Sequence, residues 1–230
     1  NLSPRIVIAE SDSRQLYRGF DVGTAKPTAE ERRYVPHLGI DVLDPTERAS
    51  AAWWAEQAGG WIRTVLDSGR TPVVVGGTGL YLRAAVADLE LPPPPEPGAR
   101  ERFEQLYDDL GAERAHELLA ERDRAAAAIV HANDRKRVVR ALELAQAGSS
   151  LLPVANRLWG AETRHPTLVV GLDVPPDVLA ERIDRRTHQM FERGVEGEVR
   201  TALRGSVSQT ALTIHGLGDL CRFLGTEPPL

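Results

Sequence analysis

The sequence has one cysteine, Cys221, two lysines, and no apolar run near the length of a membrane-spanning helix. A lone cysteine excludes a disulfide framework and any zinc site built from several cysteines. A helix that crosses a bilayer needs about 20 consecutive, mainly apolar residues, which no stretch provides. A phosphate-binding P-loop needs a lysine between glycine and serine or threonine. Because Lys26 follows Ala25 and Lys136 follows Arg135, neither lysine belongs to such a motif.

The composition is otherwise that of a globular protein. Acidic residues outnumber basic ones, 33 to 28, so the chain is not a polycation that binds nucleic acid through net charge. Its 230 residues, 42% apolar and 27% charged, allow one large domain or a core domain with a smaller insert. The charged residues 1–10 lack the pattern of a secretory signal peptide. We therefore expect a cytoplasmic protein without membrane contact.

Two apolar, β-branched runs predict buried parallel strands, at residues 5–9 and 71–75. The second run passes through a glycine-rich turn at residues 76–79 into a helical pattern at residues 80–87. Strand, glycine turn and helix form the βα unit of a doubly wound sheet. Apolar residues at helical spacing predict another helix at residues 50–68. The pattern indicates an α/β fold with a parallel sheet flanked by helices.

A helical segment interrupts this α/β pattern. Five prolines within residues 92–97 predict an extended linker. Residues 99–146 then have an almost continuous helical pattern, broken near Gly111 and around residues 131–134. Strand character returns at residues 167–173, ahead of a helix predicted at residues 177–204. We therefore expect two domains: an α/β core of residues 1–92 and 166–230, and a helical insertion of residues 93–165.

Two loops follow the predicted strands and contain candidate functional residues. Asp12 lies just after the first strand, at the carboxyl edge where open α/β sheets bind ligands, and can accept a proton there. The alternative is a solvated aspartate or a helix cap. Gly76, Gly77 and Gly79 leave backbone N–H groups open to an anion, and Thr78 adds a hydroxyl. A tight turn without a ligand explains these glycines equally well.

Clustered cations form the second group of candidates. Lys26 lies in a Gly/Thr/Pro loop suited to a diphosphate oxygen, unless it is an ordinary surface lysine. A helical pattern at residues 135–140 contains four cations and no acid, which suits a phosphate backbone but also describes a solvated helix face. Arg182 and Arg186 lie one helical turn apart, where they can hold a diphosphate or pair with nearby acids.

Five motifs in order resemble the tRNA dimethylallyltransferases, over about residues 6–224. That family has a P-loop-NTPase-like fold and transfers a dimethylallyl group to N6 of the adenosine next to the anticodon. The motifs are Asp12-Ser-Arg-Gln-Leu-Tyr-Arg-Gly19, Asp21-Val-Gly-Thr-Ala-Lys-Pro-Thr28, Pro36-His-Leu-Gly-Ile-Asp-Val-Leu-Asp-Pro45, Gly76-Gly-Thr-Gly-Leu-Tyr81 and Arg137-Val-Val-Arg-Ala-Leu-Glu143.

The resemblance assigns roles to particular residues. Asp12 matches the general base and Arg186 a catalytic cation at the diphosphate, while residues 93–165 match a tRNA-binding subdomain. It implies dimethylallyl diphosphate and the tRNA anticodon stem-loop as substrates, Mg²⁺ as cofactor, and a monomer. Expected to bind substrate are Thr24, Lys26, Gly76, Gly77, Thr78 and Gly79, with Lys26 at the diphosphate and Thr78 near the target nucleotide. Expected at the tRNA are Ser13, Arg14, Gln15, Lys136, Arg137 and Arg140.

The sequence also departs from the family pattern. The family has a P-loop, with the strand and helix it connects, ahead of the first motif, whereas this sequence starts at Asn1 beyond it. We expect one side of the sheet to be exposed as a result. The alternative to an active transferase is a truncated, inactive homologue that binds only tRNA. A nucleotide kinase is a weaker third reading, because it too requires the P-loop.

Overall fold

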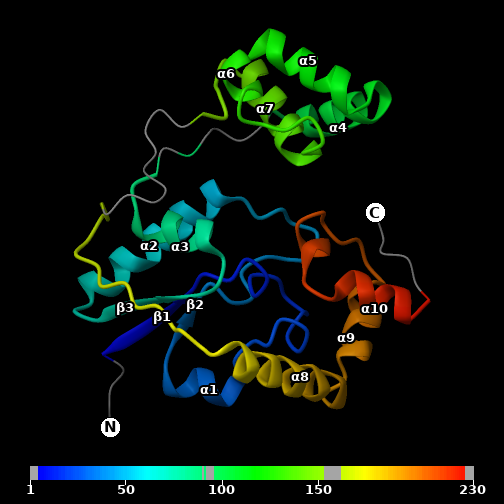
Figure 1. The fold of residues 1–230 in the computed structure, drawn as a ribbon. Helices are drawn as coiled ribbons and strands as arrows, with labels where there is room; N and C mark the ends of the chain where they lie inside the picture. Colours follow the sequence, from blue (N-terminus) through cyan, green and yellow to red (C-terminus); the bar gives the residue numbers. More distant parts are fainter. Residues whose placement is uncertain (1–4, 90, 92–95, 153–161, 226–230) are drawn as a thin grey trace. The chain divides into compact units, whose positions relative to one another are not determined.

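A computed structural model of the chain describes residues 5–89, 91, 96–152 and 162–225 (Figure 1). The chain divides into two compact units. One is an α/β unit of Asn1–Ala87 and Thr163–Leu230, and the other is a helical unit of Asp88–Glu162. Most of the proline-rich linker expected at residues 92–97 lies outside the described residues.

The α/β unit is built on a parallel sheet with the strand order β2-β1-β3. Ile8 of β1 lies opposite His37 of β2 and Val73 of β3. The two strands predicted from apolar runs are confirmed, and so is the α/β class with helices beside a parallel sheet. The strands are β1 (Ile6–Glu10), β2 (His37–Leu38) and β3 (Thr71–Val75).

Two predicted helices pack together beside this sheet, α2 (Ala51–Asp67) and α3 (Gly79–Val86). The Ser50 hydroxyl caps α2 by accepting a hydrogen bond from the Trp53 N–H at 3.1 Å. Trp54 is fully buried, its indole N–H donates to the Tyr81 carbonyl at 2.9 Å, and its ring stacks on Tyr81 with centroids 5.5 Å apart. The aromatic pair therefore joins the two helices at their core.

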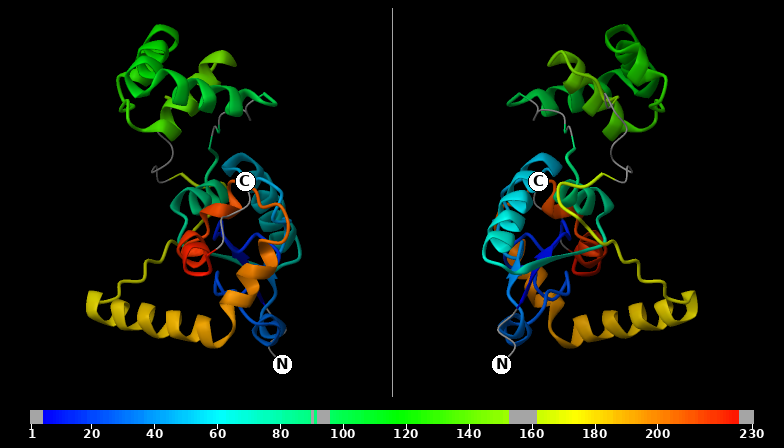
Figure 2. Two further views of the ribbon diagram at one scale, coloured as in Figure 1. Left: turned by 90° about the vertical axis from the view of Figure 1, so that its right-hand side faces the viewer. Right: turned by 90° about the vertical axis from the view of Figure 1, so that its left-hand side faces the viewer.

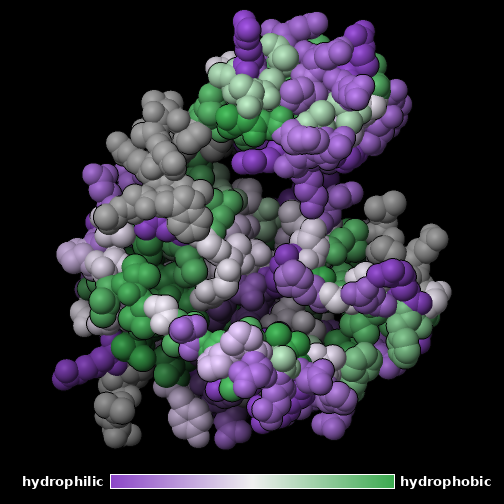
Figure 3. All heavy atoms as spheres, viewed as in Figure 1, coloured by the Kyte–Doolittle hydropathy of each residue, from purple (hydrophilic) through white to green (hydrophobic). Residues whose placement is uncertain are grey.

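The two faces of the sheet are covered unequally. Val7 and Ala9, on the face packed by α2 and α3, are 3% and 1% exposed. Paired residues of a parallel sheet point to the same side, so Ile6, Val73 and Val75 share the other face, and they are 40%, 37% and 43% exposed. In the described part of the chain this second face is therefore a partly exposed apolar surface. Hydrophobic side chains gather on the left of the α/β unit in Figure 3.

The strand predicted at residues 167–173 is wrong. This segment pairs with none of the described strands, and Leu168, Val170 and Leu172 are 88%, 73% and 92% exposed. An apolar, β-branched run is typical of a strand buried within a parallel sheet, but it becomes a strand only where another strand pairs with its backbone. The sequence pattern therefore indicates a preference for extended, strand-forming backbone, but the described tertiary structure provides no strand to pair with it.

The single helix predicted at residues 177–204 is two helices, α8 (Pro176–Glu192) and α9 (Val195–Ala202). Gly194, with φ 85°, has a left-handed conformation that ends the first helix and precedes the second. α8 projects from the rest of the α/β unit in both views of Figure 2 and contains no buried residue. α9 in contrast buries Val195 and Val199.

The helical unit contains α4 (Ala99–Leu110), α5 (Ala112–Arg122), α6 (Arg124–Ala127) and α7 (Arg135–Gln146). The predicted break at Gly111 is confirmed, since its φ of 76° separates α4 from α5. Leu119 and Leu142 are fully buried in a core shared with the other helices. Asp123 adds a break that periodicity did not predict, because its carboxylate caps α6 through the Ala126 N–H.

Three short elements complete the α/β unit: α1 (Ala29–Tyr34), the 3-10 helix η1 (Ala211–Thr213) and α10 (Leu217–Phe223). Thr28 and Glu31 form a capping box at the start of α1, with reciprocal hydrogen bonds of 3.2 and 2.7 Å. None of the described helices is long and apolar enough to cross a lipid bilayer.

Candidate functional site

The two candidate loops meet at the carboxyl edge of the sheet, because β1 and β3 are adjacent and parallel. Gly76 passes so close to the first loop that a Cβ there would lie 2.6 Å from the Ser11 carbonyl carbon. Since real Cβ atoms do not approach that closely, only glycine permits this crossing. Gly76 thus allows the two loops to come together.

Thr78 joins the same two loops through its side chain. Its hydroxyl oxygen accepts a hydrogen bond from the Ser13 N–H at 3.4 Å and lies 3.3 Å from the Ser13 hydroxyl. Although Thr78 occupies the cap position of α3, its side chain makes no capping hydrogen bond. Ser13, predicted at the tRNA, and Thr78, predicted near the target nucleotide, therefore lie in direct contact.

Asp12 is held at the rim of this junction. One carboxylate oxygen accepts the Arg14 N–H at 2.9 Å, which fixes the turn after β1, and the residue remains partly exposed. The Arg14 guanidinium donates to the carbonyl and hydroxyl oxygens of Thr213. Residues 11–15 are thereby tied to both the turn after β3 and the segment near α10.

Glu10, the last residue of β1, is a site residue that the sequence analysis missed. It is 8% exposed, and its burial, with the neighbouring charge of Asp12, raises its pKa to about 7. A carboxyl group of this kind still carries a proton in much of the population near neutral pH. The available signal was an acidic residue at the end of an otherwise apolar strand.

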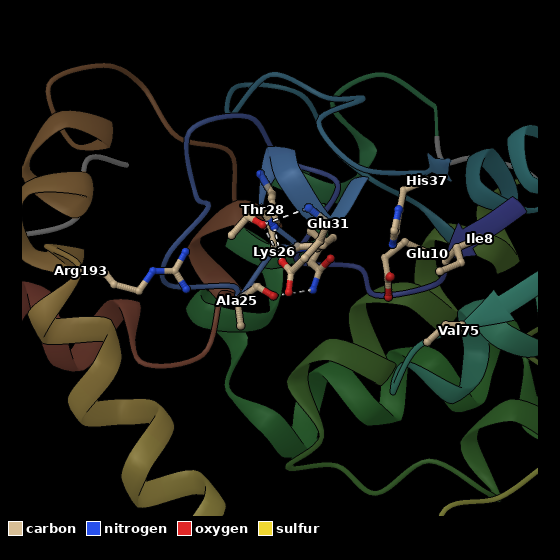
Figure 4. A pocket seen from close by; sticks show the side chains of 11 residues that line it. Ile8, Glu10, Ala25, Lys26, Thr28, Glu31, His37, Val75 and Arg193 are labelled. Carbon is tan, nitrogen blue, oxygen red and sulfur yellow. Dashed lines mark hydrogen bonds between the residues drawn. The ribbon is translucent and has the colours of Figure 1, made fainter. Parts of the chain in front are cut away.

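Glu10 lines a pocket of about 470 Å³ beside the exposed face of the sheet (Figure 4). Gln15 also lines it, and the Gln15 side-chain oxygen is buried without a hydrogen-bond partner. Its amide nitrogen donates to the Thr24 and Ala25 carbonyls at 3.1 and 3.5 Å. The described lining also includes Ile8, Lys26, Pro27, Thr28, Glu31, His37, Val75 and Arg193.

Lys26 is placed differently from the prediction of a cation open to a diphosphate. Its side chain is 1% exposed, and the ammonium donates to the Tyr17 carbonyl at 2.5 Å, Asp21 at 2.7 Å and Asp41 at 2.6 Å. An ammonium has three protons, and all three are used by these contacts. The structure thus gives Lys26 a role in fastening its own loop, while diphosphate binding by Lys26 stays a prediction.

Asp41 completes the ion-pair network around the buried Lys26 ammonium. Burial alone would raise its pKa, but hydrogen bonds from Lys26 and Arg32, at 2.6 and 2.8 Å, hold that pKa below its usual value. The hydroxyl of Thr24, a residue predicted to bind substrate, donates a hydrogen bond to the Phe20 carbonyl. The loop of residues 20–26 is therefore held by its own polar groups.

Arg186 is exposed on α8, and no described hydrogen bond or ion pair joins it to the loop of Asp12. The described structure does not bring Arg186 to Asp12, and the catalytic role of Arg186 stays a prediction. Gly77 and Gly79 follow β3 as expected, and Gly77 has open space where a side chain would be.

The cations predicted to contact tRNA lie on α7 in the helical unit. Lys136 and Arg137 are exposed, as a phosphate-binding role requires. Arg140 in contrast donates to the fully buried carboxylate of Glu143 at 2.9 Å, and Arg135 pairs with Asp108 at 2.6 Å. Half of this cationic cluster thus has a structural partner.

Comparison with known proteins gives consistent results. The family model described as IPP transferase matches residues 15–228. The tRNA dimethylallyltransferase of Corynebacterium efficiens is 42% identical over 86% of this chain and 65% of its own length. That of Mycobacterium tuberculosis is 41% identical over 93% of this chain and 67% of its own length. The chain thus spans about two thirds of these relatives.

Solved structures agree with the sequence relatives. The tRNA isopentenylpyrophosphate transferase of Bacillus halodurans superimposes with a TM-score of 0.62 at 33% identity, over 95% of this chain and 69% of that one. A transferase of the same name from Staphylococcus epidermidis gives 0.61 at 29% identity, over 95% and 72%. Both the α/β unit and the helical unit fall within such coverage.

Proposed function

Because this chain belongs to the IPP transferase family, we propose that it takes part in dimethylallyl transfer to tRNA. The acceptor is N6 of the adenosine next to the anticodon, and the donor is dimethylallyl diphosphate. The observation that carries the proposal is the junction of Asp12, Ser13 and Thr78 at the carboxyl edge of the sheet. Ligands of open α/β sheets bind at this edge.

The transfer proposed for this site needs a base for the N6 proton and a leaving group that takes the electron pair of the broken bond. The N6 lone pair forms a bond to C1 of the dimethylallyl group, and the C1–O bond breaks with its electron pair leaving on the diphosphate. Asp12 takes the proton that N6 loses, as a partly exposed carboxylate at the site can do. The adenine must leave its stack to reach Asp12.

Mg²⁺ would neutralise charge on the leaving diphosphate. The described residues contain no cluster of three acidic, histidine or cysteine side chains able to hold a metal. This fits a magnesium ion bound mainly through substrate phosphates and water, which is its usual mode in phosphate-handling sites. The protein's own contribution is then to orient Asp12 through the Arg14 N–H.

The helical unit would contact the tRNA backbone through Lys136 and Arg137. Phosphate contacts position a nucleic acid, whereas base contacts identify it. Because Arg140 is engaged by Glu143, we assign the backbone contact to the two exposed cations. Removing both should lower the slope of log affinity against log salt by about two phosphate contacts.

The test incubates the 230-residue chain with unmodified tRNA, radiolabelled dimethylallyl diphosphate and Mg²⁺, beside the Mycobacterium tuberculosis relative. Label in tRNA supports the proposal, provided that Asp12→Asn abolishes it and the exposed control Asp67→Asn does not. Retained tRNA binding without label would instead favour the alternative of a tRNA-binding homologue. Loss of tRNA binding as well would contradict both.

A further inference from the structure

The carboxylate of Glu198 lies against three consecutive backbone N–H groups of the loop that contains Lys26. One oxygen accepts the Asp21 and Val22 N–H groups, each at 2.7 Å, and the other accepts the Gly23 N–H at 2.9 Å. Successive N–H groups that point to one spot form a concave anion-binding nest. Here the anion is supplied by the protein itself, from α9 about 175 residues away in sequence.

The fit of this contact depends on Gly23. A Cβ at that position would lie 3.3 Å from a Glu198 carboxylate oxygen and 3.5 Å from a Val195 methyl group. Since the first distance is tighter than most Cβ contacts, a side chain at this position would require the carboxylate to shift by a few tenths of an ångström. Hydrogen bonds to an ionised group are roughly twice as strong as neutral ones, so three of them hold the loop firmly to α9.

The held loop in turn fixes a side chain of the pocket. The backbone N–H of Lys26 donates to the Asp21 carbonyl and that of Ala25 to the Val22 carbonyl, both at 3.0 Å, so the turn is closed by its own backbone. Its carbonyls at Thr24 and Ala25 accept the Gln15 amide N–H groups. This leaves the Gln15 side-chain oxygen as the buried, unpartnered acceptor at the pocket.

We propose that Glu198 is a positioning residue that sets the orientation of Gln15 through the 21–25 loop. Glu198 does not touch substrate in this role. The unpartnered Gln15 oxygen is then presented to a hydrogen-bond donor on the acceptor nucleotide. The last step rests on the proposed function, whereas the coupling from Glu198 to Gln15 does not.

The first experiment measures this coupling without substrate, in the full chain. Glu198→Ala should speed hydrogen exchange of the Asp21–Gly23 amides at least about tenfold and shift the NMR signals of the Gln15 side-chain amide. Glu198→Gln keeps one acceptor oxygen and should retain part of the protection. Glu196→Ala, on the same helix, is the matched control and should change neither. Unchanged amide exchange, or an unchanged Gln15 signal, in Glu198→Ala would overturn the proposal.

The second experiment is a double-mutant cycle with Gln15→Ala, read as tRNA affinity and as the split between KM and kcat. If Glu198 acts through Gln15, Glu198→Ala should raise the tRNA KM about tenfold and add little in the Gln15→Ala background. Additive losses would overturn the proposal. If the unmodified chain neither binds nor modifies tRNA, the proposed function fails, and the Gln15 amide signals still decide the role of Glu198.

Discussion

The two units of this chain bury their apolar residues to different extents. In the helical unit, consecutive helices bury Leu119 and Leu142 completely in one cluster. In the α/β unit, one sheet face is covered by helices and the other leaves Ile6, Val73 and Val75 at least 37% exposed. Helices joined by short turns cover one another with local contacts, whereas a parallel sheet needs strands and helices from distant segments on both faces.

The largest expected effect comes from a matched pair of leucines. Leu119→Ala should destabilise the helical unit by about 3 kcal/mol, because it leaves a cavity in a closed core. Leu168→Ala in the α/β unit should change stability by about 0.5 kcal/mol or less, because that side chain is 88% exposed. Urea unfolding followed by circular dichroism gives both values. Equal losses would show that residues 167–173 are packed in solution.

The two lysines of the chain provide the next comparison. Lys26→Met should cost about 2–3 kcal/mol, because it leaves Asp21 and Asp41 without their buried cation. The Asp21 side chain is 60% exposed and that of Asp41 30%, which keeps the loss below that of a fully buried pair. Lys136→Met, at an exposed position of the helical unit, should stay within about 0.5 kcal/mol. The fluorescence of the α2 tryptophans follows unfolding of the α/β unit, which contains Lys26. If Lys26→Met left the free energy of unfolding unchanged, Lys26 would not fasten its loop.

A third prediction concerns pH. The Glu10 pKa is about 7 in the folded chain and 4.5 unfolded, so the folded state binds this proton more tightly. The free energy of unfolding should therefore fall as pH rises from about 4.5 to 7. Glu10→Gln removes this proton linkage. The free energy of unfolding of the variant, taken relative to that of the unchanged chain, should therefore rise by about 2 kcal/mol from pH 5 to pH 8. A gain that does not depend on pH, or equals that of the exposed control Glu56→Gln, would contradict it.

The smallest expected effects are equal in the two units. Ser50 caps α2 in the α/β unit, and Asp134 caps α7 in the helical unit by accepting the Arg137 N–H at 3.1 Å. Replacing either with alanine should cost about 1 kcal/mol, because capping is a local interaction that neither core affects. Thermal unfolding of both variants checks this. A clear difference between them would mean that tertiary contacts contribute to one cap.

Much of the fold was predictable from local patterns. β1 and β3, the helices α2 and α3, and the break at Gly111 follow from periodicity, caps and glycine conformation, which act within a few residues. The meeting of residues 11–15 with residues 76–79 was also predictable, because carboxyl ends of adjacent parallel strands share one edge. The strand expected at residues 167–173 was not formed, because a strand requires a partner that periodicity cannot supply.

The candidate site was less predictable than the fold. Asp12 and Thr78 were found from their places after strands, but Glu10 was missed because its significance depends on burial and on the charge of Asp12. Lys26 was predicted to be open because its neighbours in sequence are small and polar. The structure instead surrounds its ammonium with three oxygens, two of which come from residues nine and fifteen positions away.

The sequence by itself determined the α/β class, the helical insertion and the residues of the two loops after β1 and β3. Only the tertiary structure decided that Lys26 is buried and that Glu198 accepts the N–H groups of residues 21–23. The physical reason is the sequence distance over which the interactions act. Backbone preference and hydrophobic periodicity act between near neighbours, whereas burial and ion pairing depend on which distant segments meet.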